Sequence, residues 1–203
     1  MTFDRRRLLG AMAAGGAGLI STRAFGLPLC GDAPALMPQA LAAMDTHAHE
    51  IANRDVLGIV NFDAHSRLPR FQLVNVATGR VLKSLLVAHG RGSDPDNSGF
   101  AERFSNREGS NASSCGAFVT GDIYSGKHGR SRRLIGLEPE NNAALARNIV
   151  IHGADYVDPW VAAAQGRIGR SQGCFAVARS EIAEVLDLLG PGRLLFAWKA
   201  ATA

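Results

Sequence analysis

The sequence is short of aromatic residues, of long apolar runs and of acidic residues. Aromatics make up 6% of the 203 residues, whereas glycine occurs 23 times. This balance favours a loop-rich β protein over a helical bundle. The apolar run of residues 11–20 has about ten residues, which is too short to span the roughly 30 Å apolar core of a bilayer as a helix. A protein with several membrane spans is therefore not expected.

The chain length bounds the number of domains. A chain of 203 residues can form one domain with its own hydrophobic core and falls short of the usual size of two. The hydrophobic fraction of 46% and the charged fraction of 20% are near those of soluble globular proteins, which argues against disorder. We expect one domain behind a leader, without a stable membrane span and acting as a monomer.

The shortage of acidic residues is largely a property of the N-terminus. The formal net charge is +4. Residues 1–24 hold four arginines and one aspartate, so their removal would take away three of the four net positive charges. The remaining chain has no marked basic character, and nucleic acid is not an expected partner.

Residues 1–24 have the order of regions found in an export signal. The segment from Asp4 to Gly10 resembles the twin-arginine signature, and a short Ala- and Gly-rich apolar run follows it. Cleavage after Ala24 would follow a small residue. We predict a twin-arginine-type signal peptide over 1–24 and a periplasmic or cell-envelope location; the alternative is an amphipathic or disordered arm. Leu29 precedes Cys30 where a lipoprotein signal needs a small residue, so lipidation is not expected.

The rest of the chain predicts a mainly β domain over 56–199, after a linker and short helix in 25–55. Apolar spacing permits a helix within residues 34–53. β-branched and apolar clusters predict seven strands: 56–62, 70–76, 81–89, 117–124, 133–137, 148–153 and 193–198.

Three further segments are assigned by their composition. Residues 90–115 are dense in Gly, Ser, Asn and Asp and predict a long functional or covering loop. Residues 141–147 predict a short helix. A third helix is expected over 181–189, with Ser180 as its N-cap.

The strongest chemical signal is a cysteine box that follows a histidine at the end of a buried strand. Cys174 lies in Gly169-Arg170-Ser171-Gln172-Gly173-Cys174, downstream of Ile151-His152-Gly153. A thiol with its free pKa of about 8.5 is mostly protonated at neutral pH, so a neighbouring imidazole that takes the proton activates it. Gly173 permits a tight turn in which its own N–H and that of Cys174 point at one oxygen, as in an oxyanion hole.

The box and its surroundings resemble the L,D-transpeptidase (YkuD-like) catalytic domain family, in its murein L,D-transpeptidase branch. The resemblance extends from Val56 to Trp198. It is carried by the Ser-x-Gly-Cys box and by the following segments: His89-Gly90, Phe104-Ser105-Asn106, Lys127-His128-Gly129, Gly136-Leu137-Glu138 and Ile151 to Val157. Gln172 stands where most members of the wider family have histidine.

The resemblance implies a β-sandwich with a few short helices and a peptidoglycan L,D-transpeptidase activity. Cys174 would attack the third residue of a peptide stem, His152 would be base and then acid, and the Gly153 carbonyl would orient His152. The residues expected to contact the substrate are Arg170, Ser171, Gly173 and His128. No cofactor or metal is required. With water as acceptor, the same pair would make a cell-wall L,D-carboxypeptidase; a third alternative is a wall-binding module without activity.

Other cysteines and histidines have weaker interpretations. Cys30 and Cys115 could pair in an oxidising compartment, which would leave Cys174 free. Asp45, His47, His49 and Glu50 invite a metal site, but two ligands on a helix or linker do not close one. Cys174 could also be a buried structural thiol, and His152 a core histidine. His89 is equally compatible with a place at the border of the cleft and with a turn or packing role. The cluster from Arg130 to Arg133 favours a solvated turn over a phosphate or glycan contact.

Overall fold

The computed structural model of the protein describes residues 34–200. Its helices are α1 (Met37–Thr46), α2 (Pro159–Gln165) and α3 (Ile182–Leu188), with one short 3-10 turn, η1 (Arg91–Ser93). Its strands are β1 (Val56–Asn61), β2 (Phe71–Asn75), β3 (Val81–Leu85), β4 (Gly116–Gly126), β5 (Gly129–Gly136), β6 (Val150–Ala154), β7 (Phe175–Ala178) and β8 (Leu194–Trp198). The predicted signal peptide and Cys30 lie outside the described residues.

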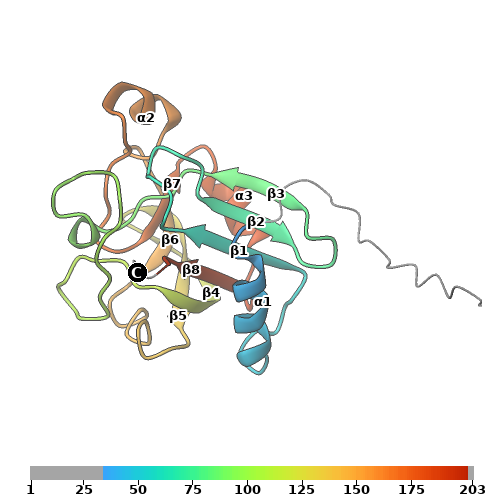
Figure 1. The fold of residues 1–203 in the computed structure, drawn as a ribbon. Coiled ribbons are helices and arrows are strands. Elements are labelled where there is room, and N and C mark those ends of the chain that lie inside the picture. The colour runs from blue at the N-terminus through green and yellow to red at the C-terminus, as the bar shows by residue number, and fades with distance from the viewer. Residues whose placement is uncertain (1–33, 201–203) are drawn as a thin grey trace, which may run out of the picture.

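The described strands form one sheet in the order β3-β2-β1-β8-β4-β5-β6-β7 (Figure 1). The pairs β1–β8 and β6–β7 are parallel, and the other pairs are antiparallel. The two ends of this order approach each other beyond β3, where the Ala88 N–H donates to the Ala176 carbonyl at 2.8 Å. The sheet therefore curls until the chain after β3 lies along β7.

Strand alternation divides the apolar residues between the inside and the outside of this sheet. Val60, Phe118, Ile151 and Phe175, which come from four different strands, belong to one fully enclosed cluster. Because successive strand residues point to opposite faces, the neighbours of these residues face outward. The predicted fold class is confirmed: the protein is mainly β, with three short helices in the described residues.

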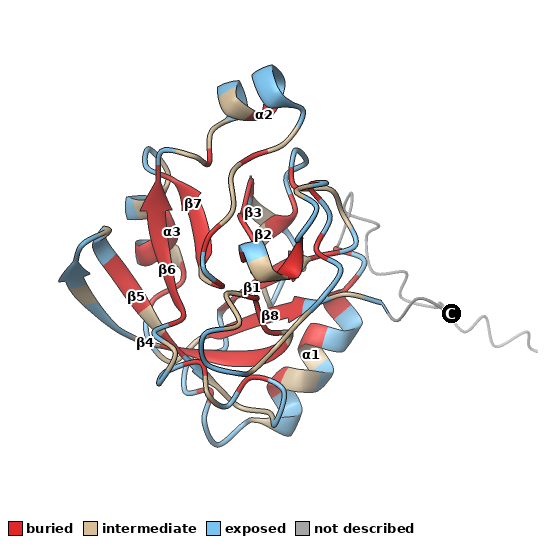
Figure 2. Ribbon diagram, turned by 90° about the vertical axis from the view of Figure 1, so that its left-hand side faces the viewer, coloured by how far each residue is buried: buried red, intermediate tan, exposed pale blue. Residues whose placement is uncertain are grey.

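Two helices, α1 and α2, cover separate parts of the outer face of the sheet. On β1, β8 and β4, α1 packs through Met44 and Ala40 against Leu57 and Phe196 in a second apolar cluster. On the outer side of β7, Ala162 of α2 belongs to a third, smaller cluster with Ala176. Figure 2 shows the buried strands around the interior and the exposed far end of the β4–β5 hairpin.

All seven predicted strands are present, but other predictions of local structure fail. β7 and α2 were not expected. Residues 141–147 form turns instead of a helix, because the Asn141 side chain accepts from the Glu138 N–H and donates to the Ala117 carbonyl. Ser180 does not cap α3, whose N-cap is Glu181 without a side-chain hydrogen bond. Within residues 34–200, no helix is long and apolar enough to cross a membrane.

Candidate active site

A pocket of about 560 Å³ lies where β6 and β7 meet the β4–β5 hairpin and the 90–115 loop. Five of the predicted site residues line it: Cys174, His152, Arg170, Ser171 and His128. The sheet therefore brings together residues that are far apart along the chain. The other two predicted residues, Gly153 and Gly173, lie next to His152 and Cys174 in the backbone.

The parallel pair β6–β7 positions the histidine beside the cysteine. His152 pairs with Ala176 across this ladder, and Ile151 pairs with Phe175. Ile151 points into the interior cluster, so the alternation turns His152 to the outer face, toward the pocket. Cys174 directly precedes β7 and so reaches the same end of the pair.

Hydrogen bonding fixes the form in which His152 exists. Its Nδ1 lies 3.0 Å from the Gly153 carbonyl oxygen. Because a carbonyl only accepts, Nδ1 carries the proton, and Nε2 of the neutral ring is an acceptor. Burial lowers the pKa of His152, and the charge of Lys127 acts in the same direction. The His128 ring stacks on it with centroids 4.3 Å apart.

The Cys174 thiol is protonated at rest. Burial raises its pKa above the ordinary value, and the Val150 N–H together with the charges of Arg147 and Lys127 only partly opposes this. The thiol donates to the Asn148 carbonyl at 3.6 Å. No hydrogen bond joins Cys174 and His152 in the described part of the chain, so the resting pair is a neutral thiol and a neutral imidazole in one pocket.

The turn before Cys174 is held from within by Ser171. The Ser171 hydroxyl donates to the Cys174 carbonyl at 2.7 Å and accepts from the Gly173 N–H at 3.1 Å. The Gly173 N–H, expected to face a substrate oxygen, is therefore already engaged. Gly173 has φ of 115°, and a Cβ there would lie 2.7 Å from the Ala112 carbonyl oxygen, so only glycine fits.

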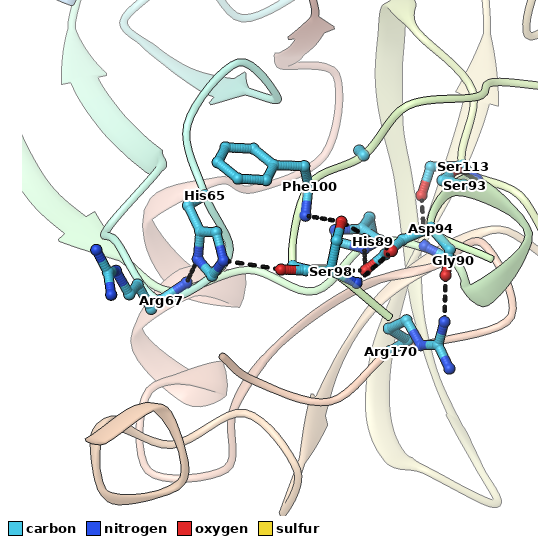
Figure 3. Close-up of polar contacts among 12 residues, drawn as sticks. His65, Arg67, His89, Gly90, Ser93, Asp94, Ser98, Phe100, Ser113 and Arg170 are labelled. Atoms are coloured by element: carbon cyan, nitrogen blue, oxygen red, sulfur yellow. Dashed lines mark hydrogen bonds and ion pairs between the residues drawn. The ribbon is translucent and has the colours of Figure 1, made fainter. Parts of the chain in front are cut away.

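A buried polar network includes His89 and Asp94, which Figure 3 shows side by side. The Arg70 guanidinium lies 2.6 Å from His89 Nδ1, and His89 Nε2 lies 3.2 Å from Asp94 Oδ2. Since arginine only donates, His89 accepts at Nδ1 and donates from Nε2, as a neutral ring. Burial, aided by Arg70, lowers the pKa of His89 to about 4.

This network supports the cysteine turn through its backbone. The His89 carbonyl accepts from the Ser171 N–H at 2.8 Å. The Ser113 hydroxyl donates to the Gly173 carbonyl at 3.1 Å and accepts from the Gly90 N–H at 3.0 Å. The 90–115 loop therefore packs against the turn that carries Cys174. His89 supports that turn from behind and is absent from the pocket wall.

The pocket wall carries more positive than negative charge. Lys127, Arg147 and Arg170 line it, and Glu108 is the sole carboxylate among its lining residues. Arg170 donates from Nη1 to the Asp94 carbonyl, which leaves most of its donors available to a ligand. Such a wall favours an anionic ligand.

Sequence reasoning missed several residues of the pocket wall. Tyr156, Asn148 and Arg147 lie near the cysteine box only in the folded chain. Asn148 has φ of 55°, an unusual conformation for a residue other than glycine, and its carbonyl accepts from the Cys174 thiol. The one signal in the sequence was the place of Asn148 at the start of the predicted strand that carries His152.

The residues considered for a metal site do not converge. His47 Nε2 lies 3.5 Å from a Glu138 carboxylate oxygen, and Asp45 pairs with Arg54. His49 and Glu50 are exposed. Residues 34–200 contain no group of three or more His, Cys, Asp or Glu side chains placed to hold a metal ion. Cys115 packs against the interior cluster, and its pairing with Cys30 stays a prediction.

A thiol and a neutral imidazole that share a pocket at one end of a parallel strand pair define a candidate acyl-transfer site of the cysteine type. Residues 32–198 match the family model described as L,D-transpeptidase catalytic domain. The chain therefore belongs to the L,D-transpeptidase catalytic domain family.

Solved L,D-transpeptidase structures are similar to this chain at low identity. The enzyme from Mycobacterium smegmatis is 15% identical with a TM-score of 0.42, and the match covers 71% of this chain and 58% of that one. The L,D-transpeptidase from Xylanimonas cellulosilytica is 16% identical with a TM-score of 0.43, over 79% and 70% of the two chains. The helical cell shape determining protein Pgp2 from Campylobacter jejuni is 10% identical with a TM-score of 0.46, over 81% and 58%. No curated protein matches the sequence.

Proposed function

We propose that the protein is a peptidoglycan L,D-transpeptidase whose nucleophile is Cys174 and whose base is His152. The observation that carries the proposal is the neutral His152 ring, with its accepting Nε2, in the pocket that also holds the Cys174 thiol. Membership of the L,D-transpeptidase catalytic domain family supports this reaction class. The expected substrate is a tetrapeptide stem of peptidoglycan.

The proposed reaction has two acyl-transfer steps. Cys174 Sγ attacks the carbonyl carbon of the third stem residue while the thiol proton passes to His152 Nε2. The tetrahedral intermediate collapses with cleavage of the peptide bond, and the terminal D-alanine leaves with that proton on its amine. An amine of a second stem then attacks the thioester, releases the thiol and forms a 3→3 cross-link.

The surroundings of the pair support these steps. The His152 ring is buried and His128 stacks on it, which shields the ring from water and strengthens its electrostatic interactions, while Cys174 is half-buried in the pocket wall. The available guanidinium donors of Arg170 suit a substrate carboxylate, which an arginine binds in a two-pronged fashion. The Gly153 carbonyl holds the His152 ring through both steps.

The cell wall as substrate places the proposed activity outside the cytoplasm. Residues 1–24, the predicted twin-arginine-type signal peptide, would provide the export route. Their sequence is the basis of this part of the proposal, since they lie outside the described residues.

The first test is intact-mass spectrometry of the purified protein with a tetrapeptide stem or a carbapenem. The wild type should gain one acyl group on Cys174, and Cys174→Ala should gain none. An adduct of unchanged yield in Cys174→Ala would contradict the proposed nucleophile. A wild type that never acquires an adduct would instead favour a wall-binding module.

A second measurement separates transfer to an amine from transfer to water. Muropeptides from purified wall fragments, incubated with the protein, should include 3→3 linked dimers. Shortened stems without dimers would identify the protein as an L,D-carboxypeptidase that uses the same pair.

A further inference from the structure

Arg147 joins the loop beside the pocket to the segment that precedes His152. Its Nη1 donates to the Ser105 carbonyl at 2.6 Å and to the Ser114 hydroxyl at 2.8 Å. Its Nη2 donates to the Ala112 carbonyl at 2.6 Å and to the Ser110 hydroxyl at 3.2 Å. All four acceptors are neutral oxygens of one stretch of chain.

These contacts leave Arg147 with a charge but almost no donors. A guanidinium has five N–H groups, and four of them are already used. The two-pronged binding of a substrate carboxylate is thus not open to Arg147, in contrast to Arg170. Arg147 also forms no ion pair with any carboxylate of residues 34–200. Its positive charge is half-buried and has no protein counter-charge there.

Arg147 shares the pocket wall with Cys174. The Cys174 thiol donates to the carbonyl of Asn148, the residue directly after Arg147. The Ala112 carbonyl that accepts from Arg147 also occupies the space that a Cβ on Gly173, next to the cysteine, would need. The positive charge of Arg147 lowers the pKa of Cys174, against the opposing effect of burial.

We propose that Arg147 is a positioning residue that supplies the fixed positive charge for the Cys174 thiolate and ties that charge to the folded 105–114 segment. This inference rests on the proposed function of Cys174 as nucleophile. When the thiol proton passes to His152, the thiolate gains a nearby cation that needs no rearrangement, because the four hydrogen bonds already hold it. Loosening of the loop would remove that cation.

Other charged and titratable groups also face Cys174 from the pocket wall. Lys127 lies on the hairpin turn and acts in the same direction as Arg147, as an exposed and therefore more strongly screened charge. The remaining groups of this kind in the wall are His128, His152, Tyr124, Tyr156, Arg170 and Glu108. Arg147 differs from the flexible cations because its hydrogen bonds fix it.

The test is the pH dependence of Cys174 alkylation by iodoacetamide in the full-length protein, followed by peptide mapping to separate Cys174 from the other cysteines. Arg147→Gln should raise the pH at which Cys174 reacts and lower the alkylation rate about tenfold at any pH below the thiol pKa, because a thiol pKa one higher means tenfold less thiolate. Arg147→Lys keeps the charge and should recover most of the rate.

Two control variants separate charge from anchoring. Ser114→Ala removes one hydrogen bond of Arg147 but keeps its charge, so it should lower the unfolding temperature and leave the pH profile in place. Arg103→Gln removes an exposed charge of the same loop and should change neither the unfolding temperature nor the pH profile of alkylation. A folded Arg147→Gln with the wild-type pH profile would overturn the proposal, as would equal shifts in Arg147→Lys and Arg147→Gln. If Arg147→Gln does not fold, a tenfold loss of the alkylation rate in folded Arg147→Lys, which keeps the charge, overturns it instead.

This measurement is independent of the peptidoglycan reaction. Iodoacetamide reports the thiolate whether or not a stem peptide is a substrate. A protein that is inactive on wall fragments but shows the shift in Arg147→Gln would contradict the proposed function and keep the role of Arg147.

Discussion

The outer face of the sheet is covered by a helix on one side and by a hydrogen-bonded loop on the other. Beneath α1, the contacts are apolar and include Met44 and Leu57. Beside the pocket, the 90–115 loop is held by polar groups, among them Ser113 and Arg147. Apolar packing tolerates substitutions that conserve volume, whereas a buried hydrogen-bond network needs each partner in place. Substitutions beneath α1 should therefore change stability alone, whereas substitutions in the 90–115 loop should change the chemistry as well.

The largest effect is expected from His152→Ala on the loop-covered side. Without the accepting nitrogen, the rate of acyl-enzyme formation should fall about 100-fold to 10,000-fold, the usual contribution of a general base. Single-turnover mass spectrometry with a carbapenem measures this rate. His49→Ala, which removes an exposed imidazole after α1, is the matched control. Equal rates in the two variants would exclude His152 as the base.

The helix-covered side should respond in stability alone. Met44 is fully buried, so Met44→Ala should lower the free energy of unfolding by about 2–5 kcal/mol, whereas Met44→Leu should cost less than about 1.5 kcal/mol. Urea unfolding measures both. The acylation rate of the folded variants should stay at the wild-type value. A rate that falls with stability would show that the two faces are coupled.

Acid should lower the free energy of unfolding through a residue on the loop-covered side, His89. The folded protein keeps His89 unprotonated down to a pKa of about 4, while the unfolded chain binds that proton near pH 6.5. Acidification from pH 6.5 to 4 therefore favours unfolding, by on the order of 3 kcal/mol from this residue. His89→Gln cannot bind the proton.

Urea unfolding at pH 7 and pH 4.5 measures that difference. The wild type should lose more stability between the two pH values than His89→Gln does. His49→Gln, on the other side, should behave as the wild type. Identical losses in the wild type and His89→Gln would mean that His89 binds its proton equally well in both states.

The smallest effect is expected from a single hydrogen bond of the loop. Ser113→Ala leaves the Gly173 carbonyl and the Gly90 N–H without their partner, which should cost about 1–3 kcal/mol of unfolding free energy. Because Gly173 precedes the cysteine, the acylation rate should fall as well. Ser84→Ala, at an exposed position of β3, should change stability by no more than about 0.5 kcal/mol and leave the rate alone. A wild-type acylation rate in Ser113→Ala would show that the hydrogen bonds of the loop do not contribute to acylation.

Much of the fold could be predicted from the sequence because strands with one buried face carry a local pattern. All seven predicted strands are present, and the motif residues Cys174 and His152 line one pocket. Residues 175–178 were missed as β7 because a four-residue strand is too short for periodicity to stand out. The start of α2 had a readable signal, since Asp158 caps it and Pro159 follows in the first turn.

The failures concern residues whose role depends on distant partners. Residues 141–147 have a composition that suits a helix, but Asn141 bonds to a strand far away in the chain. The same holds for Arg147, whose four acceptors lie in the 105–114 segment. Neither helix propensity nor the spacing of apolar residues reveals such long-range contacts.

The parallel direction of β6 and β7 explains why His152 and Cys174 are separated along the chain. Two parallel neighbours cannot be joined by a hairpin, so the chain must leave the sheet and return to its starting end, and α2 lies on that crossover. The distance between the two residues is set by the ladder and does not depend on the length of the crossover. Insertions around α2 can therefore reshape the pocket wall while the pair stays in register, whereas a slip of β7 by one residue would turn its side chains to the opposite face.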